Sequence, residues 1–354
     1  MAALSAARAQ AYIVAAKRTP FGAFGGTLKD LKASELGGLA SRAALSTLPK
    51  ETRVDSVIFG LCGSGFQSLI NAVQEIQLGE SNIVLTGGTE NMSMAPYTLH
   101  GTRFGNARYG VDQKLVDSLA AALVDQVPGA TPGAAPTPMG ITAENLAQKY
   151  GITREQCDAY ALRSQQRWAA AQESGAFEAE ISPVELKTRK GTQVHTYNST
   201  TAEITQIKWI VCLQMFSVDE HPRPTATLEA LAKLPSVFIK NTGTVSAGNA
   251  SGIGDGAAAN VVASEEACKQ YNLPKLARIA FAAQWLAVQK ELELPDEKSN
   301  VFGGAIALAH PLGASGARIV ANMVHNLRRL NKKYGVGAAC IGGGQGIAVV
   351  LERV

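Results

Sequence analysis

The stretch from residue 60 to residue 68, "GLCGSGFQS", joins an apolar run to a segment with helical spacing. The preceding run "VDSVIFG", residues 54–60, predicts a strand. The segment after it has apolar residues at helical spacing and then a glycine stop, at Phe66, Ile70, Val73, Ile76 and Gly79. The quoted stretch is therefore a tight connection between a strand and a helix, and it contains a cysteine.

Cys62 stands where the positive end of the helix dipole and free backbone N–H groups favour a thiolate. The small residues that follow it let a substrate approach the backbone closely. Both conditions suit a nucleophile. The alternative is an inert buried thiol, which is the commoner state of a free cysteine.

The same order of elements recurs in the last third of the chain. Cys62 is followed by Gly-Ser-Gly, the predicted helix and the strand "NIVLTGG", which ends in a glycine pair. His310 is followed by "PLGASG", the amphipathic segment 316–330, the strand "YGVGAAC" and the glycines 342–344. Two such halves, each with a reactive side chain at the same place, predict a duplicated α/β fold.

His310 and Cys340 extend the set of reactive side chains. His310 precedes a Gly-rich turn into a helix, where its neutral form is favoured and suits a general base; a histidine that caps this turn is the alternative. Cys340 precedes three glycines whose N–H groups suit an oxyanion hole, although alone it reads as a core thiol. Together with Cys62 they supply a nucleophile, a base and a separate proton donor.

Two loops give weaker signals. Arg223 in "DEHPRP" suits a phosphate, but a single arginine is slight evidence, and His221 beside it reads as a solvated loop residue. The small-residue loop 247–257, "AGNASGIGDGA", permits close contact between backbone and ligand, or is simply a turn.

Composition excludes several classes of protein. The chain has 354 residues and a formal net charge of +4 without a dense basic run, which does not favour nucleic-acid binding. No apolar run is long enough to span a bilayer, and no GxGxxG follows the first predicted strand. Five scattered cysteines without metal-type spacing favour a reducing compartment: Cys62, Cys157, Cys212, Cys268 and Cys340. The acid-poor start, rich in alanine and serine, resembles a mitochondrial targeting segment.

The middle of the chain is less regular. Residues 91–140 lack clear periodicity, and "PGATPGAAPTPMG", residues 128–140, reads as a connector. Thr153 and Gln156 form a capping box for a helix that ends at Gly175.

A series of ordered motifs resembles the thiolase family, and most closely the mitochondrial 3-ketoacyl-CoA thiolases: "LCGSGFQS", "GGTENMS", "TAENLAQKY", "RSQQRW", "DEHPRP", "AGNASG", "GGAIALAHPLGASG" and "CIGGGQG". The resemblance implies a five-layer αβαβα fold with two similar halves and an inserted loop domain. We expect an N-terminal half over residues 1–238, which includes the loop domain at about 91–238, and a C-terminal half over residues 239–354.

The same resemblance implies roles for individual residues. Cys62 is the acylated nucleophile, His310 activates it, and Cys340 moves the proton on the α-carbon of the substrate. The N–H groups of Cys62 and Gly342 form an oxyanion hole, and Arg223 and Ser251 contact coenzyme A. Coenzyme A is a substrate, no permanently bound cofactor or metal is expected, and the expected assembly is a homodimer or homotetramer. The expected compartment is the mitochondrial matrix, with the cytoplasm as the alternative.

The reaction implied is ping-pong cleavage of a 3-ketoacyl-CoA by coenzyme A to acetyl-CoA and a shortened acyl-CoA, as in fatty acid β-oxidation. Run in reverse with acetyl-CoA, it makes acetoacetyl-CoA. Relatives selective for acetoacetyl-CoA often carry a histidine where this chain has Pro138, so broader chain-length use is expected.

The chain departs from the family pattern in several places. Several dozen residues that normally separate "VDSVIFG" from the nucleophile are missing, as is an asparagine motif after "LARIA". Residues 192–216 have no counterpart over most of their length, and Ala309 replaces the glycine that usually precedes the histidine. Two alternatives follow: an inactive thiolase-like protein that binds coenzyme A or regulates, or a truncated splice or gene-model product. A related condensing enzyme is disfavoured because those enzymes typically have histidine or asparagine in place of Cys340.

Overall fold

The computed structural model describes residues 10–60, 63–105, 108–125, 137–190, 210–280, 295–342 and 345–354. Within them the helices are α1 (Ala33–Leu45), α2 (Ser64–Leu78), α3 (Ser118–Ala122), α4 (Met139–Tyr150), α5 (Arg154–Glu173), α6 (Leu228–Ala232), α7 (Glu265–Gln270), α9 (Ala305–Leu308) and α10 (Leu312–Arg329), with short 3₁₀ turns at Met92–Met94, Thr102–Phe104 and Asp296–Lys298. The strands are β1 (Ala11–Arg18), β2 (Gly22–Ala23), β3 (Ser56–Gly60), β4 (Ile83–Asn91), β5 (Tyr97–Leu99), β6 (Leu115–Asp117), β7 (Val124–Asp125), β8 (Thr137–Pro138), β9 (Val184–Lys190), β10 (Ile210–Phe216), β11 (Gly254–Ser264), β12 (Ala277–Ala280), β13 (Tyr334–Gly342) and β14 (Gln345–Glu352).

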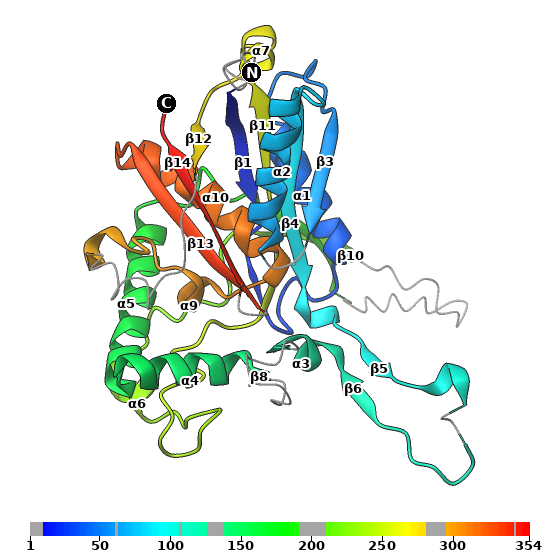
Figure 1. Cartoon of the computed structure of the whole chain (residues 1–354), viewed down its shortest axis with the longest axis vertical. Coiled ribbons are helices and arrows are strands. Elements are labelled where there is room, and N and C mark those ends of the chain that lie inside the picture. Colours follow the sequence, from blue (N-terminus) through cyan, green and yellow to red (C-terminus); the bar gives the residue numbers. More distant parts are fainter. Residues whose placement is uncertain are drawn as a thin grey trace, which may run out of the picture.

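An eight-stranded mixed sheet forms the centre of the molecule (Figure 1). Its main path runs β13-β14-β12-β1-β11-β4-β3, and β2 pairs with the end of β11. β1 lies in the middle of this path, because it pairs antiparallel with β11 on one side and with β12 on the other. β3 and β4 are parallel, as the intervening helix requires.

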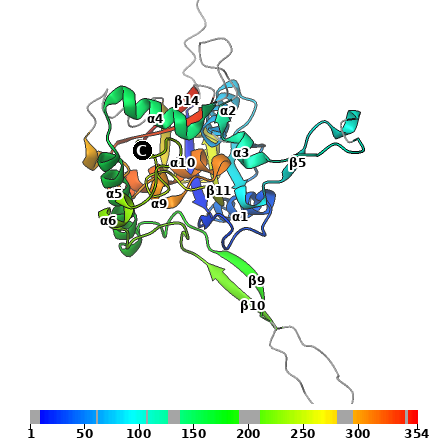
Figure 2. The same ribbon diagram turned by 90° about the horizontal axis from the view of Figure 1, so that it is seen from below.

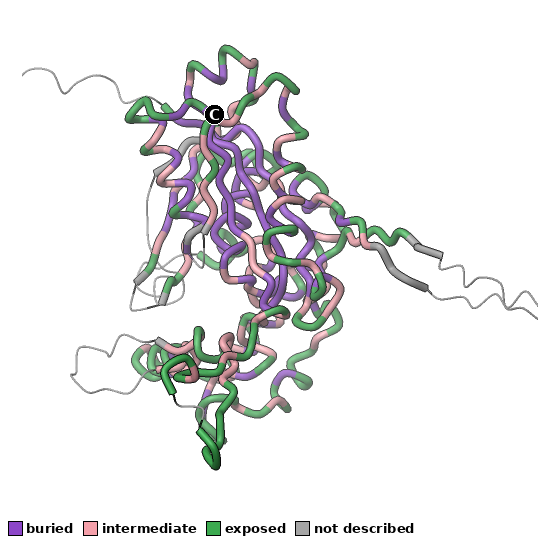
Figure 3. Tube along the Cα trace, turned by 90° about the vertical axis from the view of Figure 1, so that its right-hand side faces the viewer, coloured by how far each residue is buried: buried purple, intermediate pink, exposed green. Residues whose placement is uncertain are grey.

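We call the strands β1, β11, β4 and β3 the first wing of the sheet, and β12, β14 and β13 the second wing. One face of the first wing is covered by α1, whose Leu36, Ala40 and Ala44 are buried against Val14 and Leu85. β11 is buried along its whole length, so side chains pack against both of its faces. Figure 3 shows the buried residues gathered in the segments at the centre of the molecule.

Helices α2 and α10 lie together between the two wings (Figure 1). Phe66 and Leu69 of α2 and Val320 and Val324 of α10 form one buried cluster with residues of both wings, among them Val84 and Val349. In the second wing Gly337 lies against α10, since a Cβ there would lie 2.6 Å from the side chain of Ile319. The repeat expected from the sequence, a helix and then a strand after each reactive residue, is therefore packed around a common helical layer.

The outer face of the second wing is open in the part of the chain that the structure describes. Tyr334 and Val336 alternate with inward-facing residues of β13 and are 58% and 54% exposed. Four of the five expected layers are thus seen in the described residues: α1, the first wing, α2 with α10, and the second wing.

The middle of the chain forms short elements outside the sheet, in keeping with its weak periodicity. The β5–β6 and β9–β10 hairpins project from the body (Figure 2). Residues 191–209, most of the unmatched segment, lie outside the described residues. The middle is tied to β1 through the fully buried Arg18, whose guanidinium donates to Glu180 at 2.7 Å and to Asp219 at 2.6 Å. The division at residues 238 and 239 stays a prediction.

Candidate active site

The N-terminal ends of α2 and α10 meet in the middle of the molecule. A Cβ on Gly65 would lie 2.2 Å from the amide nitrogen of Ala317, and one on Gly316 would lie 2.6 Å from the amide nitrogen of Phe66. Only glycine permits this approach of two helix backbones. Cys62 lies outside the described residues, but α2 begins two residues after it, at Ser64. The crossing therefore lies within a few residues of both Cys62 and His310.

His310 occupies the connection between α9 and α10. Its backbone N–H donates to the carbonyl of Gly252 at 2.7 Å, which joins it to the loop before β11. Its ring nitrogen Nδ1 lies 2.6 Å from the hydroxyl of Ser315, one turn into α10. The backbone of His310 is thus tied to the Gly252 loop, and its imidazole to its own helix.

The pKa of His310 is lowered from its ordinary value of 6.5 to about 4. The main cause is burial, which disfavours the charged imidazolium, and the nearby positive charge of Arg318 adds to it. The sequence predicted a neutral histidine from its place at a helix N-terminus. Burial contributes more than that argument supposed, and the ring is neutral at pH 7.

Ala309, directly before the histidine, has φ 71° and ψ 175°. This backbone region is essentially restricted to glycine, because a Cβ crowds the neighbouring peptide groups. Ala309 replaces the glycine that usually precedes the histidine in the family, and its positive φ is the conformation that such a glycine adopts without penalty. The site therefore carries backbone strain next to its predicted base.

Cys340 lies near the end of β13, and its side chain is exposed. Its neighbour Ile341 packs toward the start of α2, since a Cβ on Gly63 would lie 2.5 Å from the Ile341 side chain. Cys340 is an even number of residues from the exposed Tyr334 and Val336, so in the regular part of β13 its thiol is on their face, away from the helices. The structure thus brings the backbone beside Cys340 to the residue after Cys62, but it does not point the thiol toward α2.

Gly342, the second predicted oxyanion donor, ends β13 and pairs with Gln345 of β14 across an irregularity in the ladder. Residues 343 and 344 between them lie outside the described residues. The sequence placed a glycine loop here, and the structure extends the strand to Gly342. The oxyanion roles of Cys62 and Gly342 stay predictions.

The two predicted contacts for coenzyme A lie near one another through Gly252. His221, two residues before Arg223, packs on that glycine, where a Cβ would lie 2.1 Å from the imidazole. Ser251 precedes Gly252 and is exposed, as is Arg223, whose Nη1 donates to the carbonyls of residues 220, 221 and 222. Since the Gly252 carbonyl accepts the His310 N–H, the loop that carries Ser251 adjoins the predicted base, and Arg223 lies two residues from the histidine that packs on this loop.

The loop that carries Ser251 is fixed by carboxylates from α4 and α5. Buried Glu144 accepts hydrogen bonds from the backbone N–H groups of Thr244 and Val245 at 2.8 and 2.9 Å. The side chain of Asn249 donates to Asp158 at 2.8 Å. The loop is thus rigidly positioned although its outer residues are exposed.

Two polar residues near the site were missed by the sequence argument. Glu90, within "GGTENMS", accepts a hydrogen bond from the Gly313 N–H at 3.2 Å, and burial raises its pKa. Ser315 lies within "GGAIALAHPLGASG" and contacts His310. Both residues belong to sequence motifs that resemble the family as whole stretches. The sequence does not single them out within those motifs, and their tertiary contacts do.

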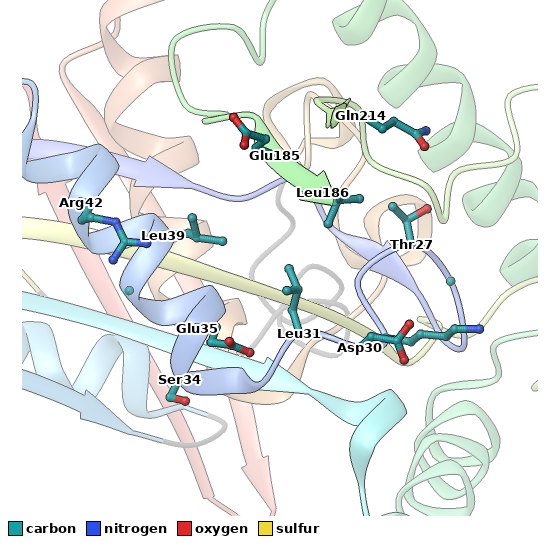
Figure 4. A pocket seen from close by; sticks show the side chains of 13 residues that line it. Thr27, Asp30, Leu31, Ser34, Glu35, Leu39, Arg42, Glu185, Leu186 and Gln214 are labelled. Carbon is teal, nitrogen blue, oxygen red and sulfur yellow. The ribbon is translucent and has the colours of Figure 1, made fainter. Parts of the chain in front are cut away.

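A large cavity lies elsewhere, between α1 and the β9–β10 hairpin (Figure 4). Its volume is about 1000 Å³, and its lining includes Ser34, Arg42 and Glu185 but none of the predicted site residues. In the described ranges, no group of three or more His, Cys, Asp and Glu side chains is placed to hold a metal ion. Each helix within the described residues is too short or too polar to cross a bilayer.

Comparisons with known proteins agree with this architecture. The thiolase N-terminal domain family matches residues 11–61 and 49–266, and the thiolase C-terminal domain family matches residues 248–353. The mitochondrial 3-ketoacyl-CoA thiolase of Mus musculus is 45% identical over 419 residues, covering 97% of this chain and 98% of that protein. Because the alignment is longer than the 354 residues of this chain, the relative has segments without a counterpart here.

Solved structures give the same result. The crystal structure of human mitochondrial 3-ketoacyl-CoA thiolase is 43% identical with a TM-score of 0.86, over 99% of this chain and 100% of that one. A second structure of the human protein, in complex with CoA, is 42% identical with a TM-score of 0.84, over 98% of each chain. Sequence and fold agree along nearly the whole chain, and the protein therefore belongs to the thiolase family of acyltransferases.

Proposed function

We propose that the protein cleaves 3-ketoacyl-CoA with coenzyme A, giving acetyl-CoA and an acyl-CoA shortened by two carbons, in fatty acid β-oxidation. The observation that carries the proposal is the crossing of α2 and α10 at Gly65 and Ala317, beside a neutral His310. This crossing lies within a few residues of Cys62 and His310. A cysteine and a neutral imidazole at two adjoining helix ends are the parts that covalent acyl transfer needs.

In the first half-reaction the thiol proton of Cys62 moves to the free ring nitrogen of His310. The thiolate attacks the 3-keto carbon of the substrate, and N–H groups at the helix end stabilise the oxyanion that forms. The bond between C2 and C3 then breaks, which leaves the acyl group on Cys62 and the electron pair on the acetyl-CoA carbanion. Cys340 supplies the proton that this carbanion takes up, which requires its thiol to turn from the outer face of β13 toward the substrate.

In the second half-reaction the Cys340 thiolate takes the thiol proton of a new molecule of coenzyme A, whose sulfur attacks the acyl group on Cys62. The acyl-CoA leaves, and Cys62 recovers the proton that His310 holds. A second thiol is useful because the first is covalently occupied while protons still have to move. Arg223 and Ser251 contact coenzyme A beside the Gly252 loop. The steps are reversible, so acetyl-CoA is also condensed to acetoacetyl-CoA.

A second candidate function is binding of acyl-CoA without turnover. It is favoured by the exposed Cys340, whose thiol is on the face of β13 away from α2. It is also favoured by the relatives' additional segments, since one is expected directly before the nucleophile, where its absence would remove support from Cys62.

Intact-protein mass spectrometry after addition of acetoacetyl-CoA separates the two candidates. Turnover predicts an acetyl adduct on Cys62 that disappears when coenzyme A is added. A Cys62→Ser variant should form no such thioester, whereas Cys157→Ser, at a half-buried cysteine of α5, should retain it. Retention of coenzyme A in a binding assay without any adduct would support the second candidate and overturn the first.

Two features of the biological context belong to the same proposal. The protein acts in the mitochondrial matrix, as the alanine- and serine-rich start and the mitochondrial relatives suggest. A fluorescent protein fused behind residues 1–30 should enter mitochondria, and a diffuse cytoplasmic signal would contradict this. The active form is a homodimer or homotetramer, which light scattering on the purified protein tests.

A further inference from the structure

Ser315 is a buried hydroxyl in direct contact with the predicted base. It lies in the first turn of α10, is 3% exposed, and its Oγ is 2.6 Å from Nδ1 of His310. The reaction steps above give it no part. A serine five residues after a histidine would not touch it in an extended chain, but the turn into α10 brings the two side chains together.

The second hydrogen bond of this hydroxyl fixes the direction of the first. Ser315 Oγ also lies 2.9 Å from the carbonyl oxygen of Pro311, four residues earlier. The structure directs the single hydroxyl proton of Ser315 to this carbonyl, which also accepts the backbone N–H groups of Ala314 and Ser315. The oxygen then accepts from His310, and the proton of that hydrogen bond resides on Nδ1.

The charge on the imidazole completes the assignment. His310 is half-buried with its ring desolvated, and the guanidinium of Arg318 on the next turn of α10 adds positive charge nearby, so the ring carries one proton rather than two. With that proton on Nδ1, the other nitrogen, Nε2, has a free lone pair. That nitrogen is the one able to accept a thiol proton.

We propose that Ser315 is a positioning residue of the acyl-transfer site, which holds His310 as the Nδ1–H tautomer so that Nε2 accepts the proton of the nucleophilic thiol. The inference rests on the proposed thiolase function for its kinetic consequence. The tautomer itself is a property of the free protein and is measured without substrate. Ser315 therefore acts on the reaction through His310 and does not need to touch the substrate.

The first test is nitrogen NMR on the full-length protein labelled at histidine with ¹⁵N. The signals of His310 are identified by their loss in a His310→Gln variant. We expect a protonated Nδ1 and an unprotonated Nε2 at pH 7. A proton on Nε2 would overturn the inference, and this measurement does not require any variant of Ser315 to fold.

The second test compares Ser315→Ala with Ser41→Ala. Ser41 is a matched control, because its hydroxyl makes the same bond to a carbonyl four residues earlier, Gly37 at 2.7 Å, but lies on α1. Loss of an orienting partner typically costs about 10- to 100-fold in activity. We expect kcat for Ser315→Ala to fall by roughly that factor, with the KM for coenzyme A within about twofold of the parent and Ser41→Ala unchanged.

The kinetic and spectroscopic results together separate this inference from the proposed function. In Ser315→Ala, we expect the ¹⁵N spectrum to show a mixture of the two tautomers. An unchanged kcat, or a fall in kcat with the tautomer still fixed, would overturn the role of Ser315. If the parent protein does not turn over 3-ketoacyl-CoA, the proposed function fails, while the tautomer in the parent still tests the assignment of Ser315.

Discussion

Gly65 in α2 and Ala317 in α10 approach so closely that a Cβ on the glycine would lie 2.2 Å from the alanine amide nitrogen. The corresponding glycine of the second helix, Gly316, packs in the same way on Phe66. The two helix N-termini therefore meet in direct backbone contact at this point. The distance between the two halves of the candidate site depends on this contact.

A methyl group at the crossing should separate the helices. Gly65→Ala is expected to destabilise the fold by about 1–3 kcal/mol, because neither backbone can move without disturbing the core on both wings. Gly38→Ala in α1 is the control, since its Cβ would meet only the flexible end of Arg42 at 3.5 Å. That control should stabilise by about 0.5–1 kcal/mol. Urea unfolding measures both changes, and equal effects would contradict the crossing.

Relief of strain beside the histidine should stabilise the protein. With φ 71° and ψ 175°, Ala309 occupies a backbone region that glycine adopts without penalty. Ala309→Gly is therefore expected to raise the free energy of unfolding by about 1 kcal/mol. In the neighbouring helix α9, Ala307→Gly should instead lower it by a similar amount. A destabilised Ala309→Gly would show that this conformation is not adopted in solution.

The low pKa of His310 predicts how stability depends on pH. The unfolded chain takes up a proton on this side chain near pH 6.5, whereas the folded protein does so near pH 4. Between these values the unfolded state binds more protons, so stability falls as pH decreases through this window, by up to about 3 kcal/mol. Above pH 6.5 the contribution is fully present. A His310→Gln variant should show a shallower acid limb in urea unfolding, and an unchanged limb would contradict the shift.

The pKa of His310 also predicts how kcat/KM falls at acid pH. If His310 must be neutral to accept a proton, kcat/KM should stay level well below pH 6.5 and fall only as pH approaches about 4. Replacing Arg318 with methionine removes a positive charge near the ring, so the pKa of His310 should rise toward its ordinary value. A histidine NMR titration of Arg318→Met measures this directly. A decrease in the pKa would refute the electrostatic argument.

Arg223 should matter for coenzyme A rather than for chemistry. Arg223→Ala is expected to raise the KM for coenzyme A roughly tenfold, the usual effect of losing a hydrogen bond to a charged group, with kcat nearly unchanged. Arg163→Ala, which breaks a partly exposed ion pair with Asp296, should leave both constants near the parent values. Initial rates at varied coenzyme A concentration distinguish the two, and equal KM values would remove Arg223 from the binding site.

Local patterns predicted most of the individual elements. The helix after Cys62, its stop at Gly79 and the capping box of α5 all appear where periodicity and end signals indicated. These features depend on residues within one or two helical turns of each other, and such local patterns can be read from the sequence. The repeat of elements after Cys62 and His310 likewise predicted two related halves.

Other features depend on contacts between distant segments and were not accessible in this way. The thiol of Cys340 is on the outer face of β13 because the register of a strand, not its composition, sets which side chains face the helices. Ser315 gains its importance from the turn that places it against His310. Burial, which lowers the pKa of His310 more than any single charge, is a property of the whole packed core.

The sequence by itself therefore determined the family of the protein, the elements of each half and the residue types available for acyl transfer. Only the tertiary structure decided which of these groups meet, how His310 is held and protonated, and that Ala309 is strained. The physical reason is that propensity and capping act over a few residues. Distance, burial and hydrogen-bond direction are instead set by packing between segments far apart in the chain.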